Sequence, residues 1–71
     1  MLSKKKLVEQ DIFTIESDGN FYDSNSEYVI TFENGRAILN THCEVNGIGE
    51  PIKQLMSLED LYDTCDMLGI Y

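Results

Sequence analysis

The sequence predicts an α+β domain in which an antiparallel β-meander carries one C-terminal helix on its apolar face. Two alternating segments flank an Asn34-Gly35 pair, another alternating segment precedes them, and an amphipathic helical pattern closes the chain. The meander is expected to have three strands, or four strand segments if the second one is interrupted. The 71 residues suit a single domain, because a domain of this size buries only about 60% of the surface of its unfolded chain.

The elements are expected in the following order along the first part of the chain. Residues 1–10 form a basic segment, for which a short helix and a loose chain are both compatible with the pattern. The sheet spans residues 11–45 and begins with a strand over residues 11–16. Residues 17–20 give a turn signal, and residues 23–26 interrupt the next strand as a bulge or a short loop.

The segment Glu27 to Val45 predicts a β-hairpin, since Asn-Gly is the pair favoured in a two-residue type I′ turn. This turn places Ile30 opposite Leu39. Because successive side chains of a strand point to opposite sides, the register separates two faces. The core face is predicted to hold Tyr28, Ile30, Phe32, Ala37, Leu39, Thr41, Cys43 and Val45; the solvent face is predicted to hold Glu27, Val29, Thr31, Glu33, Arg36, Ile38, Asn40, His42 and Glu44.

The last part of the chain is predicted to be a loop and a helix. Residues 46–56 are expected to form the loop, because two glycines and one proline weaken a strand ladder. The helix spans residues 57–69, with Ser57 as its N-cap and Gly69 at its end. Its apolar stripe is predicted to consist of Leu58, Leu61, Tyr62, Cys65 and Leu68.

The charge balance is the most informative bulk property. Thirteen acidic residues against five basic ones give a net charge of −8. Lys4, Lys5 and Lys6 are three of the five bases. Beyond residue 6, only Arg36 and Lys53 oppose the thirteen acidic residues. The negative electrostatic potential of such a surface disfavours direct binding to nucleic acid and favours a basic protein partner. The alternative is that the acidic surplus only keeps a small protein soluble.

The sequence supports no catalytic, metal or cofactor site, so we expect that the protein is not an enzyme. His42 is the only histidine, and the hairpin register turns it away from Cys43. Neither a phosphate-binding glycine loop nor a calcium loop is present. Cys43 and Cys65 lack zinc-ligand spacing and are interpreted as small buried groups, either reduced or joined in a disulfide.

No apolar run has the length of a membrane span, and the lysine cluster is not followed by a signal-peptide core. We therefore expect a cytoplasmic protein without membrane contacts. We expect the protein to bind its partner through surface residues, namely exposed acids and the two tyrosines outside the predicted core. The residues expected to bind the partner are Glu27, Glu33, Glu44, Glu59, Asp60, Asp63, Asp66, Tyr22 and Tyr71. Val29, Ile38 and Ile12 are expected to form a small apolar patch on the outer sheet face.

In size, acidity and lack of catalytic residues, the chain is similar to the small proteins with which phages and mobile elements block host enzymes, among them anti-CRISPR proteins and DNA-mimic inhibitors. The similarity rests on no shared motif. It implies that carboxylates on a rigid scaffold occupy the basic groove of a nucleic-acid-binding host protein. The alternative is an assembly or adaptor module that forms homodimers or larger oligomers through the outer sheet face or an edge strand.

Overall fold

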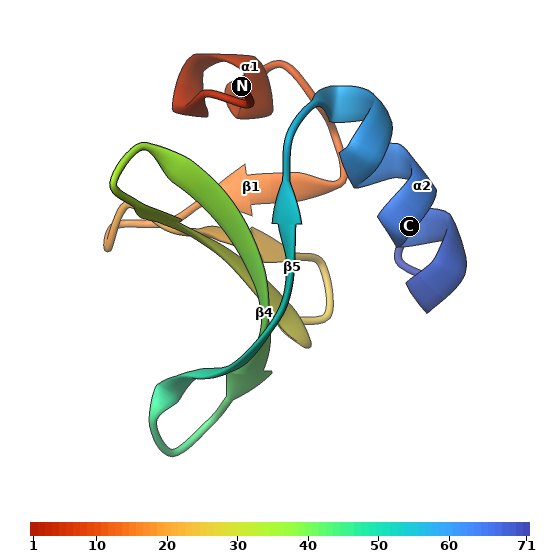
Figure 1. Cartoon of the computed structure of the whole chain (residues 1–71). Helices are drawn as coiled ribbons and strands as arrows, with labels where there is room; N and C mark the ends of the chain where they lie inside the picture. Colours follow the sequence, from red (N-terminus) through yellow and green to blue (C-terminus); the bar gives the residue numbers. More distant parts are fainter.

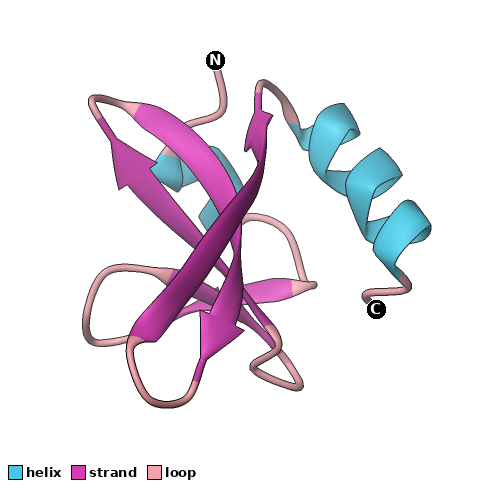
Figure 2. Ribbon diagram, turned by 60° about the horizontal axis from the view of Figure 1, so that its bottom comes forward, coloured by secondary structure: helices cyan, strands magenta, loops and turns pink.

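The computed structural model describes residues 1–71 and shows an α+β fold built on one antiparallel sheet (Figure 1). The strands follow one another in the order β1-β2-β3-β4-β5, so the sheet is a meander. The sheet is strongly twisted (Figure 2). The strands are β1 (Phe13–Ile15), β2 (Phe21–Asp23), β3 (Tyr28–Glu33), β4 (Arg36–Cys43) and β5 (Gly47–Leu55), and the helices are α1 (Lys4–Val8) and α2 (Leu58–Leu68). The predicted class and the meander are confirmed, but the strand count of three or four is wrong.

The hairpin of β3 and β4 has the predicted register. Ile30 lies opposite Leu39, and Glu33 lies opposite Arg36 across the two-residue turn. Asn34 and Gly35 both have positive φ, at 52° and 77°, as a type I′ turn requires. The turn chemistry therefore sets which residues of the two strands face each other.

The predicted interruption at residues 23–26 is a reversal of the chain between two strands. β2 pairs antiparallel with β3, with Phe21 opposite Ile30. The buried carboxylate of Asp23 accepts hydrogen bonds from the backbone N–H groups of Glu27 (2.8 Å) and Tyr28 (2.9 Å). These bonds close the connection, because they satisfy donors that the turn would otherwise leave without partners.

The largest correction concerns residues 46–56, which were predicted to be a loop and which contain the nine-residue strand β5. Pairing with β4 is irregular on both sides of Asn40, which lies opposite Pro51. A bulged edge strand tolerates proline, since one of its sides needs no hydrogen-bond donors. Glycine and proline thus shape a bulged edge strand here, where the sequence pattern suggested a break in the ladder.

Gly49 packs against Thr41 of β4, and Gly49→Ala is expected to destabilise the protein by about 1–3 kcal/mol. A Cβ at this position would collide with the Thr41 Oγ and would lie 3.0 Å from the Thr41 carbonyl oxygen. Its φ is not positive, so the expected effect is steric. Urea unfolding measures the loss. The double variant Thr41→Ala/Gly49→Ala should lose less than the sum of the single variants, and simple additivity would contradict the clash.

The core lies between one face of the sheet and the two helices. Of the two alternatives for residues 1–10, a short helix or a loose chain, the structure shows the helix, as α1. This segment contributes Leu2 and Leu7, which are both fully buried. The core cluster consists of Leu2, Leu7, Phe13, Phe21, Ile30, Ala37, Leu39, Leu55, Leu61, Cys65 and Ile70. The lysine-rich segment is therefore part of the packed fold.

α2 has the predicted ends. The Ser57 hydroxyl accepts a hydrogen bond from the Asp60 N–H (3.1 Å), and Gly69 ends the helix with a φ of 72°. The apolar stripe needs one correction, because Tyr62 is 46% exposed and Thr64 is buried in its place. The Thr64 hydroxyl can be buried because it donates to the Asp60 carbonyl oxygen at 2.7 Å.

The assignment of the two sheet faces is correct for Ile30, Ala37 and Leu39, which are fully buried, but wrong for several other residues. On the predicted core face, Thr41 and Val45 are exposed and Cys43 is half-buried, because the core cluster ends before this end of the hairpin. On the predicted solvent face, Val29, Thr31 and Asn40 are buried. The Asn40 amide donates to the carbonyl oxygens of Val29 and Ile38, which satisfies it without water.

Candidate functional site

Three of the predicted acids form a row along the outer side of α2. Glu59, Asp63 and Asp66 are all exposed, whereas the residues that the helix buries face the sheet. Positions four and seven residues apart lie on one side of an α-helix, and successive members of this row are separated by about 4–6 Å along the axis. We call these three residues the helix carboxylates. The row is rigid, because Ser57 and Gly69 hold the ends of α2.

Asp60, the fourth predicted acid of this helix, has other contacts. One carboxylate oxygen accepts the Met56 N–H at 3.0 Å, and the other lies 3.7 Å from the Lys53 ammonium. The side chain is about 30% exposed. Asp60 therefore contributes to the start of α2 and faces away from the row.

The sheet acids do not form a second row. Glu27 and Glu44 are exposed near one end of the hairpin, and Glu33 is exposed beside the turn at the other end. Glu27 lies six positions before Glu33, which corresponds to roughly 20 Å along extended chain. Of the two predicted tyrosines, Tyr71 is 84% exposed and Tyr22 is half-buried on β2. The predicted patch of Val29, Ile38 and Ile12 does not form, because Val29 is fully buried and Ile12 packs against the core cluster.

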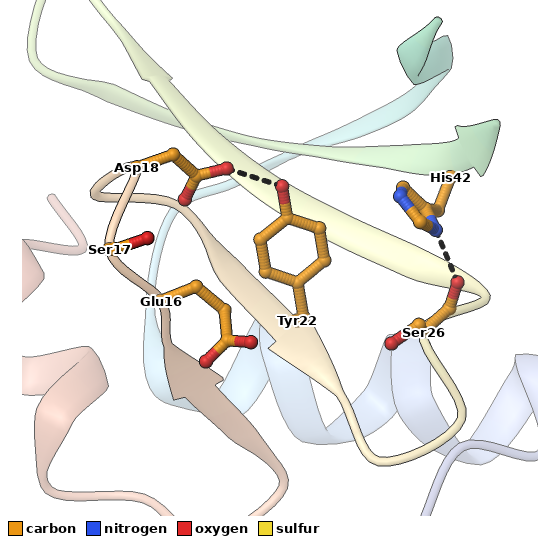
Figure 3. Close-up of a pocket in the computed structure, with 6 residues that line it drawn as sticks. All are labelled: Glu16, Ser17, Asp18, Tyr22, Ser26 and His42. Carbon is orange, nitrogen blue, oxygen red and sulfur yellow. Dashed lines mark hydrogen bonds between the residues drawn. The ribbon is translucent and has the colours of Figure 1, made fainter. Parts of the chain in front are cut away.

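A hollow of about 280 Å³ opens on the sheet face that bears Tyr22 (Figure 3). The β1–β2 turn forms one wall, the connection from β2 to β3 forms another, and β4 supplies the last side chain. We call it the Tyr22 pocket. Its lining consists of Glu16, Ser17, Asp18, Tyr22, Ser26 and His42.

Asp18 and Tyr22 are joined by a hydrogen bond of 2.5 Å, which the phenol donates to the carboxylate. The other Asp18 oxygen accepts the Asn20 N–H at 2.9 Å. The bond from Tyr22, followed by that from Asn20, lowers the pKa of Asp18 below its ordinary value. The same bond raises the pKa of Tyr22, with a smaller contribution from desolvation. Asp18 is thus a carboxylate and Tyr22 a neutral phenol at neutral pH.

His42 forms the opposite side of the pocket. Its Nδ1 lies 2.5 Å from the Ser26 carbonyl oxygen, and its ring meets the Tyr22 ring edge to face, with centroids 5.3 Å apart. A carbonyl oxygen only accepts hydrogen bonds, so Nδ1 carries the proton of this bond. These contacts restrict the orientations of the His42 and Tyr22 rings.

The two cysteines are free thiols in different surroundings. Burial raises the pKa of Cys65 to about 11, which suits the predicted packing role. Cys43 is only half-buried, contrary to the prediction, and the backbone N–H groups of Asn46 and Val45 lower its pKa. Cys43 therefore has the greater thiolate character of the two.

Sequence reasoning missed most of the pocket. Ser17 and Asp18 were recognised as turn residues, Tyr22 was predicted to bind the partner, and His42 was predicted on the solvent face of the hairpin. The missing information was the pairing of β2 with β3. This pairing puts Tyr22 opposite Val29, so that only β3 lies between Tyr22 and Asn40 on β4. No local pattern gives that pairing.

No three His, Cys, Asp or Glu side chains converge to hold a metal ion, and no helix is long and apolar enough to cross a membrane. Comparisons with protein-family models, with curated proteins and with solved structures gave no match.

Proposed function

We propose that this protein binds a basic protein partner without catalysis and inhibits it, with surface carboxylates occupying the groove in which the partner holds nucleic acid. The partner class that fits best is a nucleic-acid-binding host protein, as for the phage-type inhibitors to which the chain is similar. Lysine and arginine side chains that bind phosphate oxygens also bind carboxylate oxygens, with charge-assisted hydrogen bonds of the same kind.

The helix carboxylates are the observation that carries this proposal. They project from a capped helix, and the protein's own bases do not neutralise them, since the one ion pair in the chain joins Lys53 to Asp60. Tyr62 and Met67 flank the row and are 46% and 81% exposed. A surface that combines fixed charges with a tyrosine and a methionine is typical of a protein interface.

The test begins with proteins captured from a nuclease-treated bacterial lysate at low salt, of which one that also binds nucleic acid is purified. The triple variant Glu59→Gln/Asp63→Asn/Asp66→Asn is expected to associate with that protein more slowly and with a flatter salt dependence. The reason is that electrostatic steering acts mainly on the association rate. Stopped-flow association at two salt concentrations measures both quantities, and competition with labelled DNA measures inhibition.

The matched control is Glu27→Gln/Glu33→Gln/Glu44→Gln, which removes the same number of charges from scattered positions. Asp60 is left unchanged in both variants, because it contributes to the start of α2. Surface substitutions usually change stability by less than about 0.5 kcal/mol each, so both variants should unfold like the parent protein. Equal slowing of the two variants would mean that only net charge matters. Association at the parent rate for both would refute binding by charge.

One observation favours the assembly module as a second candidate. β5 is the last strand of the sheet, and along it and the preceding turn Ile48, Ile52 and Val45 are 43%, 42% and 89% exposed. Apolar side chains on an unpaired edge suit contact with another copy of the chain. Analytical ultracentrifugation distinguishes the candidates, since apolar assembly gives an oligomer that persists at high salt and that Ile48→Lys disrupts.

A further inference from the structure

The Tyr22 pocket is a small polar hollow whose lining has a clear chemical preference. Two of its six residues are the acids Glu16 and Asp18, and its single large apolar surface is the Tyr22 ring. Figure 3 shows Glu16, Ser17 and Asp18 on one side of the Tyr22 ring, and His42 and Ser26 on the other. The lining is rich in hydrogen-bond acceptors and contains no lysine or arginine.

The acceptors of the pocket are held in place before any ligand arrives. Each oxygen of the Asp18 carboxylate accepts one hydrogen bond, from the Tyr22 hydroxyl or from the Asn20 N–H. Since a carboxylate has about four acceptor sites, each oxygen can accept a further bond. The Glu16 carboxylate is exposed and forms no ion pair with a base of the chain. Two carboxylates of the lining therefore have no ion-pair partner within the chain.

Lys4 lies near this turn, since its ammonium would be 3.6 Å from a Cβ on Gly19, but it forms no ion pair with Asp18 or Glu16. The Lys4 ammonium lies 5.6 Å from the centre of the Phe32 ring. Phe32 points to the same side of the sheet as Phe21, whereas Tyr22 points to the other side. The pocket is consequently open to a cation from another molecule.

We propose that the Tyr22 pocket binds the guanidinium group of an arginine side chain from the partner, between the carboxylates of Glu16 and Asp18 and the ring of Tyr22. The proposal rests on the proposed function in that the partner is a basic protein. It adds an anchoring site that is distinct from the helix carboxylates.

The geometry suits guanidinium better than ammonium. A guanidinium group is flat, presents five N–H donors in a fixed arrangement and stacks on aromatic rings, whereas an ammonium group is a strongly hydrated point charge. The Tyr22 ring provides the flat surface, and Glu16 and Asp18 provide acceptors beside it. The Tyr22–His42 contact limits how far the ring can turn away.

The test uses the full chain and a defined probe. The ¹⁵N-labelled protein is titrated with N-acetyl-arginine methylamide, and the amide shifts are followed by NMR. Saturable shifts are expected at Glu16–Asp18, Tyr22, Ser26 and His42, with an affinity in the millimolar range that is typical of a single side chain. The citrulline analogue, which has the same shape without the charge, should give no saturable shift, and the lysine analogue should bind more weakly.

Two variants localise the effect. Glu16→Gln/Asp18→Asn changes two exposed acids and should weaken arginine binding by about tenfold or more, equivalent to about 1.4 kcal/mol. Tyr22→Phe keeps the ring and releases Asp18, so it should bind within about twofold of the parent protein. The triple variant of the helix carboxylates should bind arginine like the parent protein.

Three outcomes would overturn the proposal: no saturable shift at the pocket, equal shifts near all exposed acids, or tighter binding of the lysine analogue. Because the titration contains no partner protein, a negative result here leaves the helix carboxylates as the proposed contact. Conversely, arginine binding at the pocket together with normal partner association by the helix variant would refute groove binding through α2 while the pocket assignment stands.

Discussion

Leu39→Ala is expected to lower the free energy of unfolding by about 2–5 kcal/mol. Leu39 is fully buried on β4, faces Ile30 across the hairpin and belongs to the same core cluster as Phe21 and Leu61. The truncation leaves a cavity, because neighbouring side chains relax only partly. A domain of 71 residues has a total stability on the order of 4–10 kcal/mol, so this loss is a large share of it.

Urea unfolding measures the effect as a lower midpoint at an unchanged slope. Ile52→Ala is the matched control, since it also shortens an aliphatic side chain on a strand, but one that is 42% exposed. It should cost clearly less than Leu39→Ala. If the two variants unfolded at the same midpoint, Leu39 would not lie in the core and the face assignment of the hairpin would be wrong.

Gln10→Leu is expected to cost on the order of 3 kcal/mol, because the Gln10 amide holds together the connection between α1 and β1. Its oxygen accepts the N–H groups of Ile12 and Phe13, both at 2.7 Å. Its nitrogen donates to the carbonyl oxygens of Leu7, at 2.6 Å, and Phe13. The side chain is 7% exposed, so leucine would remove the acceptor of the Ile12 and Phe13 N–H groups in a place that water hardly reaches.

The control is the same substitution at Gln54, a half-buried glutamine on β5. Gln54→Leu changes polarity in the same way without opening the connection, and should stay within about 1 kcal/mol of the parent protein. Hydrogen exchange provides a second readout, since Gln10→Leu should reduce protection at Phe13 before it does so in β3 and β4. Similar unfolding midpoints for Gln10→Leu and the parent protein would show that the four bonds contribute no net stability.

The features that sequence predicted well are those that depend on neighbouring residues. Asn34-Gly35 determined the hairpin register, since the turn type depends on the backbone preferences of these two residues. Ser57 and Gly69 marked the ends of α2 for the same local reason. The outward positions of the helix carboxylates followed from helical spacing alone.

The features that sequence missed depend on contacts between distant segments. Pro51 suggested a loop, and only its place opposite the irregular ladder at Asn40 makes it compatible with a strand. The alternation predicted Asn40 on the solvent face, but its amide nitrogen donates to the Val29 carbonyl oxygen and the Thr31 hydroxyl on β3. The Tyr22 pocket combines two connections with β2 and β4, so its members share no motif that a pattern of spacing could reveal.

The meander order has a consequence for how the chain folds. Every strand pairs with its neighbour in the sequence, so each pairing closes a short loop and costs little chain entropy. Proteins dominated by such local contacts fold quickly. We expect the β3–β4 hairpin to form early and the helices to dock on it afterwards. Unpaired strands would then be exposed only briefly, which limits aggregation when the protein is made at high concentration.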